Sequence, residues 1–265
     1  YFHNFVPILN DLMHELTRKF QDFFEVVVRQ RKECPWDSVQ THQTLSQLMI
    51  EEVYEATDAI EKKDYQDLKK ELGDILLHVV LNAIIAEETN TFTMTEVLTS
   101  ITKKLIERHP HIFSDVKVNS VDEVKQNWEA LKLKEGRTSV LEGVPDALPA
   151  LLQAYRIQEK VASIGFDWQD RNQVWEKVEE EIREIKAVPV DNKDELEAEF
   201  GDLLFSLVNY ARHSGLSPEG ALSRTNRKFK RRFEHVEKRM KETNREWHQT
   251  SLQQMDLFWD EAKGL

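Results

Sequence analysis

Two short acidic segments carry the side chains of this sequence that are best suited to chemistry. Residues 179–184 read EEEIRE, and residues 195–202 read ELEAEFGD. Burying several unpaired carboxylates is costly, so carboxylates that meet in a half-buried place shift their pKa or bind cations. Oxygen ligands of this kind suit Mg²⁺, with Mn²⁺ as the alternative. The two segments therefore predict a divalent-metal site.

Two helices joined by a short turn would position these carboxylates. Hydrophobic periodicity predicts the helices at about residues 171–187 and 192–213. Pro189 ends the first helix, because proline lacks an N–H and clashes with the preceding turn. Asp191 or Asn192 can cap the second helix. The short turn favours an antiparallel pair whose helices share a face.

Glu181 is the most informative of these acidic residues, because it projects into an apolar stripe between Val174 and Val178. Glu179 and Glu197 are expected on solvated faces. The stripe of the second helix consists of Leu196, Phe200, Leu203 and Leu207. Antiparallel packing would bring four carboxylates to one half-buried spot, and these are the candidate metal ligands and catalytic groups: Glu181, Glu184, Glu199 and Asp202.

The N-terminal half of the chain repeats the pattern. Residues 51–55 read EEVYE and residues 71–74 read ELGD, which gives a second possible carboxylate set of Glu52, Glu55, Glu71 and Asp74. Each half also has a Trp-Asp or Asp-Trp pair upstream, and a Lys-x-x-x-Arg and a lone Trp downstream. An ordered series that occurs twice indicates tandem units. We expect an N-terminal unit at residues 1–135 with an extra helix at its start, a linker at 136–147 and a C-terminal unit at 148–265.

Further helices are predicted by the same periodicity, and no segment alternates as a strand would. Their approximate ranges are 5–32, 45–62, 65–88, 94–108, 121–134, 149–163, 217–242 and 251–262. The low glycine count, 8 in 265 residues, agrees with a helix-rich chain. The fold class is therefore predicted to be all-α, with two tandem helical bundles.

Composition and missing motifs exclude several classes of function. A net charge of −12 argues against a nucleic-acid or membrane binder. No stretch reaches the roughly 18 apolar residues of a membrane span, and the start shows no secretory signal. The single cysteine, Cys34, excludes an intrachain disulfide and favours a cytoplasmic location. Walker-type, His-Glu-x-x-His and Gly-x-Ser-x-Gly motifs are absent from the sequence.

The whole ordered set of motifs resembles the MazG family of nucleoside triphosphate pyrophosphohydrolases. The resemblance covers nearly all of the chain from about residue 23 onward. The motifs that carry it are Glu180-Glu181-x-x-Glu184, Glu199-x-x-Asp202, Cys34-Pro35-Trp36-Asp37, Gln40-Thr41-His42, Arg108-His109-Pro110-His111 and Gly165-Phe166-Asp167-Trp168.

The resemblance implies an all-α bundle, usually dimeric, that hydrolyses nucleoside triphosphates to a nucleoside monophosphate and pyrophosphate with Mg²⁺. Such an enzyme would act in nucleotide-pool housecleaning. By the same resemblance, Glu181, Glu184, Glu199 and Asp202 match the family's metal ligands. The positions that match its nucleotide-binding residues are Lys177, Lys228, Arg232 and Trp259.

The residue types fit these implied roles, although each has a structural alternative. Lys228 and Arg232 are four residues apart on one helix, so both can face phosphates, or they can belong to a solvated basic face. Trp259 can stack on a base or pack in the core. Asn209 follows Asp202 on the polar row and can bond a nucleotide or a metal-bound water; alternatively it is a surface amide.

The C-terminal half is predicted to be the catalytic one. Asn209 has Leu81 at the corresponding N-terminal position, and Lys177 has Leu48. An N-terminal site would therefore hold a cation yet grip a triphosphate poorly.

Two other functions stay open at this point. One is a nucleotide-binding regulatory protein with a degenerate site, and the other is a narrower enzyme that cleaves dUTP or phosphoribosyl-ATP. Long helices with broad apolar stripes also leave surface to cover, so we expect a homodimer.

Overall fold

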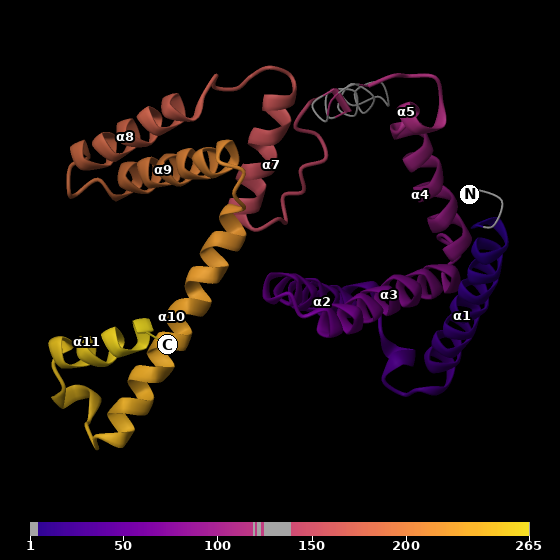
Figure 1. Ribbon diagram of the computed structural model, residues 1–265, viewed down its shortest axis with the longest axis horizontal. Helices are drawn as coiled ribbons and strands as arrows, with labels where there is room; N and C mark the ends of the chain where they lie inside the picture. The colour runs from indigo at the N-terminus through magenta and orange to yellow at the C-terminus, as the bar shows by residue number, and fades with distance from the viewer. Residues whose placement is uncertain (1–4, 119, 121–122, 125–138, 265) are drawn as a thin grey trace. The chain divides into compact units, whose positions relative to one another are not determined.

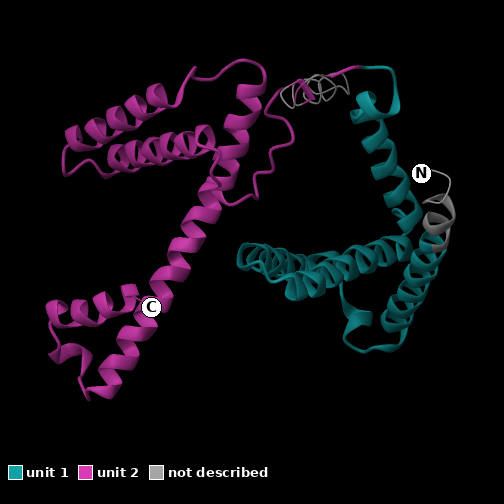
Figure 2. Cartoon of the chain, viewed as in Figure 1, with its two compact units in different colours: residues 1–116 teal, residues 117–265 magenta. Residues whose placement is uncertain are grey.

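The computed structural model describes residues 5–118, 120, 123–124 and 139–264, and every element within these residues is helical. The all-α prediction is confirmed. The chain divides into two compact units, residues 1–116 and 117–265 (Figure 2). The predicted helix at 121–134 falls mostly outside the described residues, and the predicted linker at 136–147 does so in part, so the boundary given for that linker stays a prediction.

The first unit is built on an antiparallel helix pair, α2 (His42–Lys62) and α3 (Tyr65–Glu88) (Figure 1). The long α1 (Phe5–Glu33) and α4 (Met94–Arg108) both pack against α3. Two short elements, η2 (Asp37–Val39) and α5 (Pro110–Phe113), complete the unit. The core lies where α1, α2, α3 and α4 meet, and its buried residues are Val27, Leu45, Val80, Leu81, Ala83, Ile84, Ile85 and Met94.

Capping residues fix the turn between α2 and α3. Asp64 accepts hydrogen bonds from the backbone N–H groups of Gln66 and Asp67, each at 3.1 Å, and so begins α3 as an N-cap. Lys63 precedes it in the left-handed region, with a φ of 59°. The cap at Asp64 and the left-handed residue before it make a tight turn, which sets α2 beside α3.

The second unit repeats the helix pair with α8 (Arg171–Ala187) and α9 (Lys193–His213) (Figure 1). The preceding α7 (Ala150–Ser163) packs against α9. The long α10 (Pro218–Glu242) starts beside α7, and α11 (Leu252–Glu261) packs on its C-terminal half. Two single turns, η3 (Trp247–Gln249) and η4 (Ala262–Gly264), flank α11.

The ends of α8 and α9 follow from local sequence. Asp170 caps α8, and Asn192 caps α9 by accepting from the backbone N–H of Glu195 at 3.3 Å. Of the two caps that the sequence offered for α9, Asn192 is the one used. Gly165 follows α7 with a φ of 90° and Gly215 follows α9 with a φ of 66°, so both take the left-handed conformation that glycine favours.

The two predicted apolar stripes differ in burial. Val174 and Val178 of α8 are fully buried, as the periodicity predicted. On α9, the predicted stripe stays largely open to solvent within one chain, and Phe200 is 54% exposed. Leu203, also predicted for this stripe, is half-buried, and the neighbouring Leu204, which was not predicted for it, is exposed. We use the name α9 stripe for the exposed residues of this face, which are Leu196, Phe200, Leu204 and Leu207.

No helix in the described part of the chain is long and apolar enough to cross a membrane.

Candidate active site

The α8–α9 pair brings three of the four predicted carboxylates together. One carboxylate oxygen each from Glu181, Glu199 and Asp202 lies within 4.8 Å of the other two. Glu181 comes from α8 and is only 4% exposed, because it sits in the stripe of Val174 and Val178. The other two residues come from α9, so the antiparallel packing of two helices makes this group.

Glu184 lies at the edge of the group rather than inside it. Its side chain is exposed, one turn after Glu181 on α8. Desolvation and the negative charge of Glu181 together raise the pKa of Glu184, while Lys177 opposes the shift. The fourth predicted carboxylate therefore feels the charge of the group although its oxygens are not among those that cluster.

Lys177 partly neutralises this buried charge. Its Nζ lies 2.8 Å from Glu180 Oε1 and 2.7 Å from Glu181 Oε1. Hydrogen bonds to Glu180 and then Glu181 raise the pKa of Lys177 well above its ordinary value. The ammonium therefore stays charged at neutral pH and places a positive charge beside the buried Glu181.

A cavity of about 360 Å³ opens on these residues, within the size range of small-ligand sites. We call it the carboxylate cavity; it is lined by Trp168, Val174, Lys177, Glu181, Asp202, Phe205, Ser206 and Asn209. Lys177 and Asn209, both predicted nucleotide contacts, are thus beside two of the carboxylates. The sequence did not single out Trp168, Phe205 or Ser206 as site residues, although the recurring Asp-Trp pair was a signal for Trp168.

Arg212 fixes the orientation of Asn209. Its Nε and Nη2 donate to Asn209 Oδ1 at 3.1 and 2.8 Å. A guanidinium can only donate, so the amide oxygen must face it and the amide NH₂ must point the other way. Asn209 therefore offers a hydrogen-bond donor to the carboxylate cavity.

Asp167 in turn holds Arg212 at the end of α9. Arg212 Nη1 donates to Asp167 Oδ2 at 2.9 Å, Nη2 contacts Oδ1, and His213 Nε2 lies 2.9 Å from the same Oδ1. Burial opposes the charged form, but the hydrogen bonds from Arg212 and His213 prevail and lower the pKa of Asp167. The turn at residues 165–168 is thereby tied to the last turn of α9.

The other predicted nucleotide contacts lie elsewhere in the second unit. Lys228 and Arg232 are on α10 and Trp259 is on α11, and none of the three lines the carboxylate cavity. The Arg232 guanidinium lies 5.7 Å from the centre of the Trp259 ring, and that ring lies 4.9 Å from Phe229. Figure 1 shows α11 at the end of α10 that is away from α8 and α9. Within one chain, Arg232 and Trp259 therefore lie together outside the carboxylate cavity, and Lys228 is one turn before Arg232 on α10.

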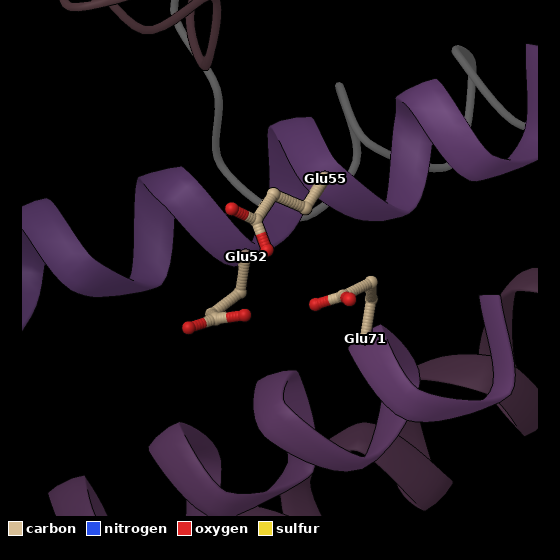
Figure 3. Close-up of side chains that lie close together, drawn as sticks. All are labelled: Glu52, Glu55 and Glu71. Atoms are coloured by element: carbon tan, nitrogen blue, oxygen red, sulfur yellow. The ribbon is translucent and has the colours of Figure 1, made fainter. Parts of the chain in front are cut away.

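The N-terminal unit carries the second carboxylate cluster. Figure 3 shows Glu52 and Glu55 on α2 and Glu71 on α3 turned toward one another, with one oxygen of each within 4.8 Å of the others. Glu71 is 1% exposed; its Oε1 lies 2.7 Å from Lys70 Nζ, and its buried Oε2 has no hydrogen-bond partner. Burial and the contact with Glu71 raise the pKa of Glu52, whereas Lys70 lowers that of Glu71. Asp74 is half-buried and outside the group.

The two clusters differ in their surroundings. Leu81, at the position of Asn209, is buried in the core of the first unit. Leu48, at the position of Lys177, packs against the same core. The N-terminal cluster thus has no counterpart of Asn209 or of Lys177, and the ammonium beside it, that of Lys70, comes from α3 instead.

Both clusters have a donor set that fits a hard divalent cation. Every ligand atom is a carboxylate oxygen, and the oxygens lie close enough to repel one another unless a cation is shared. Among the described residues, no histidine or cysteine belongs to either group.

Comparisons with known proteins agree with this arrangement. The model of the MazG nucleotide pyrophosphohydrolase domain matches twice, at residues 40–113 and 169–237. A nucleoside triphosphate pyrophosphohydrolase/pyrophosphatase MazG of Thermotoga maritima is 39% identical over 257 residues, which cover 95% of this chain and 98% of that protein. A nucleoside triphosphate pyrophosphohydrolase of Escherichia coli K12 is 40% identical over 237 residues, covering 87% of this chain and 90% of that protein. The uncharacterized protein YabN of Bacillus subtilis is 46% identical over 255 residues, covering 94% of this chain and 52% of YabN.

Proposed function

Because this chain belongs to the MazG family of nucleotide pyrophosphohydrolases, we propose that it hydrolyses nucleoside triphosphates to nucleoside monophosphates and pyrophosphate at its carboxylate cavity. The family match supports the reaction. The observation that supports the place is the buried Glu181, which shares one cavity with Asp202, Lys177 and Asn209.

Glu181, Glu199 and Asp202 would hold the metal ion, with Glu184 at the rim. Mg²⁺ is the proposed ion, because it prefers carboxylate oxygens and phosphate; when bound it neutralises triphosphate oxygens and activates water. Mn²⁺ has similar ligand preferences and is the alternative.

The other residues of the cavity have roles that follow from their hydrogen-bonding groups. Lys177 stays positively charged and can contact phosphate oxygens as well as Glu181. The amide NH₂ of Asn209, turned away from Arg212, can donate to a phosphate or to the attacking water. A carboxylate of the group can accept the proton of that water. The residues of the cavity can therefore bind the phosphates, orient the attacking water and accept its proton within one small volume.

Product analysis tests the reaction. The full chain is incubated with Mg²⁺ and each nucleoside triphosphate in turn, and the products are separated by anion-exchange chromatography. We expect monophosphate and pyrophosphate in equal amounts. We expect no turnover in EDTA, because without a cation the negative carboxylates repel the negative triphosphate. Release of orthophosphate alone would contradict the proposal.

The same panel separates the two alternatives. A regulatory protein would bind nucleotides and release no product. An enzyme restricted to dUTP or phosphoribosyl-ATP would be inactive toward the other triphosphates.

A homodimer is proposed from the exposed apolar faces of the helix pairs. Phe200 and Leu204 of the α9 stripe are open to solvent, and so are Leu72 and Leu76 at the corresponding positions of α3. Exposed apolar surface of this kind is normally covered by a partner, and a second copy is the usual one. A second copy could also bring Lys228 and Arg232 to the carboxylate cavity, which neither residue lines within one chain.

Sedimentation velocity at micromolar concentration tests the dimer. We expect twice the chain mass of 31.2 kDa. Leu204→Asp places a charge in the α9 stripe and should shift the protein toward the monomer. Val190→Asp is the matched control, because Val190 is an exposed apolar residue outside the stripe. A wild-type protein that sediments only as a monomer would refute the dimer.

A further inference from the structure

The carboxylate cluster of the first unit takes no part in the proposed hydrolysis, yet it is built around a buried charge. Glu52, Glu55 and Glu71 each bring one oxygen to within 4.8 Å of the others (Figure 3). Glu71 is almost completely buried, and its Oε2 has no hydrogen-bond partner. A buried carboxylate oxygen without a donor costs free energy, which a bound cation would recover.

Lys70 neutralises only one side of Glu71. Its Nζ lies 2.7 Å from Glu71 Oε1, and its side chain is otherwise open to solvent. The neighbours that α2 contributes are two further carboxylates, those of Glu52 and Glu55. Negative charge is therefore in excess at this place, and Oε2 is the atom left for a cation.

A buried histidine lies on the same face of α3, two turns beyond Glu71. Asp74 follows Glu71 by three residues and His78 follows Asp74 by four, and side chains at these spacings are neighbours on a helix. His78 is 7% exposed, and its Nδ1 is buried without a hydrogen-bond partner. Burial lowers the pKa of His78, and the nearby charge of Asp74 opposes that shift. The imidazole is therefore neutral at neutral pH, which is the form that binds metal ions.

The second unit shows which way the position of His78 faces. Asp202 and Ser206 are four residues apart on α9, as Asp74 and His78 are on α3. Both Asp202 and Ser206 line the carboxylate cavity. Because the two helix pairs repeat one pattern, the position of His78 faces the carboxylates of its own unit. Where the C-terminal site has a hydroxyl group, the N-terminal site has an imidazole.

An imidazole changes the cation that such a site prefers. Mg²⁺ prefers oxygen ligands, whereas the later first-row transition metals also accept imidazole nitrogen and bind a given site more tightly. Leu48 and Leu81 occupy the positions of Lys177 and Asn209, so no counterpart of either residue is present to hold a phosphate. The residues of the first unit thus suit a metal ion without a nucleotide.

We propose that the first unit binds a first-row transition-metal dication through Glu71, Asp74 and His78 of α3, together with Glu52 of α2. The ion is structural, because it joins the two helices of the pair. Asp74 and His78 are outside the group of clustered oxygens, so both side chains change rotamer when the ion binds. Bound there, the ion supplies a partner to Glu71 Oε2 and to His78 Nδ1. The carboxylate group of the second unit, whose ligands are all oxygen, keeps Mg²⁺.

Titration of the full chain with Co²⁺ in a large excess of Mg²⁺ tests this site. The excess Mg²⁺ fills the all-oxygen group of the second unit, and Co²⁺ should compete well only where a nitrogen ligand is present. We expect one tightly bound Co²⁺ per chain, followed by its visible absorption. The X-ray absorption spectrum of the bound Co²⁺ should show scattering from an imidazole ring. Bound Co²⁺ should also raise the Tm, because it binds the folded chain.

His78→Gln removes the imidazole and should weaken Co²⁺ binding at least about tenfold, a loss of ~1.4 kcal/mol. Glu71→Gln should have the same effect, whereas Glu181→Gln alters the other cluster and should leave Co²⁺ binding unchanged. His14→Gln is the matched control, since His14 is an exposed histidine on α1 of the same unit. If His78→Gln melts early, the X-ray absorption spectrum of the wild type decides the matter.

Four outcomes would overturn the proposal. The wild type could retain no Co²⁺ in excess Mg²⁺, or a folded His78→Gln could bind Co²⁺ as tightly as the wild type. The spectrum of the bound ion could show oxygen ligands alone. Loss of Co²⁺ in Glu181→Gln would place the ion in the carboxylate cavity instead. None of these results depends on turnover, so the proposed hydrolysis stands or falls separately by its products.

Discussion

Glu181→Gln is expected to lower the turnover of nucleoside triphosphates by several powers of ten and to leave the chain folded. The amide has nearly the shape of the carboxylate, so the packing between Val174 and Val178 is retained. The substitution removes the negative charge of Glu181, which is the buried member of the carboxylate group. Each ~1.4 kcal/mol of lost transition-state stabilisation lowers the rate tenfold, and the loss of a metal ligand is expected to cost several times this free energy.

The measurement is kcat/KM with Mg²⁺, together with thermal unfolding of the same preparation. Glu197→Gln is the matched control, because Glu197 is an exposed acid on α9 outside the cluster, and it should retain full activity. Wild-type turnover by Glu181→Gln would remove Glu181 from the site. A loss of activity that is matched by a fall in Tm would indicate a structural role instead.

Glu199→Gln should remove nearly all hydrolysis, whereas Glu71→Gln should leave most of it. Both residues belong to a carboxylate cluster, but only Glu199 belongs to the one beside Lys177 and Asn209. In the N-terminal unit, Leu81 and Leu48 occupy the positions of those two polar residues. A triphosphate bound there would have no equivalent of Lys177 or Asn209, and the nearby ammonium of Lys70 is paired with Glu71.

The two variants must be compared at matched Tm and matched oligomeric state. Glu71 is fully buried and paired with Lys70, so its amide variant could lose stability without any catalytic role. If Glu71→Gln were the inactive variant, the N-terminal unit and not the C-terminal unit would be the catalytic one. If each variant lost about half of the activity, both sites would work.

Much of the fold follows from sequence because its signals are local. The helices at 65–88, 94–108 and 171–187 have the predicted bounds, since periodicity, caps and Pro189 act within a few residues. The burial of Glu181 was predicted for the same reason. A single helical projection places it between two valines that the structure buries completely.

The features that could not be predicted from the sequence depend on contacts between segments that are distant in the chain. The position of Glu184 outside the carboxylate group is set by how α8 lies against α9, which a projection of one helix cannot show. The bond from Gln158 to Phe205 joins residues of two helices, and no motif marks it. The sequence predicted that some apolar surface would need a partner, but not that the α9 stripe would be that surface, because a stripe shows that a face will be covered and not whether the same chain covers it.

The tie between Asp167 and the last turn of α9 has a consequence for local stability. Helix ends fray, and their amides open at a small fraction of the free energy of global unfolding. If the final turn of α9 opened, Arg212 and His213 would leave Asp167, and Asn209 would lose the contact that orients it. The orientation of Asn209 in the carboxylate cavity therefore depends on the local opening equilibrium of the C-terminal turn of α9. A substitution there could loosen ligand binding without touching the ligand.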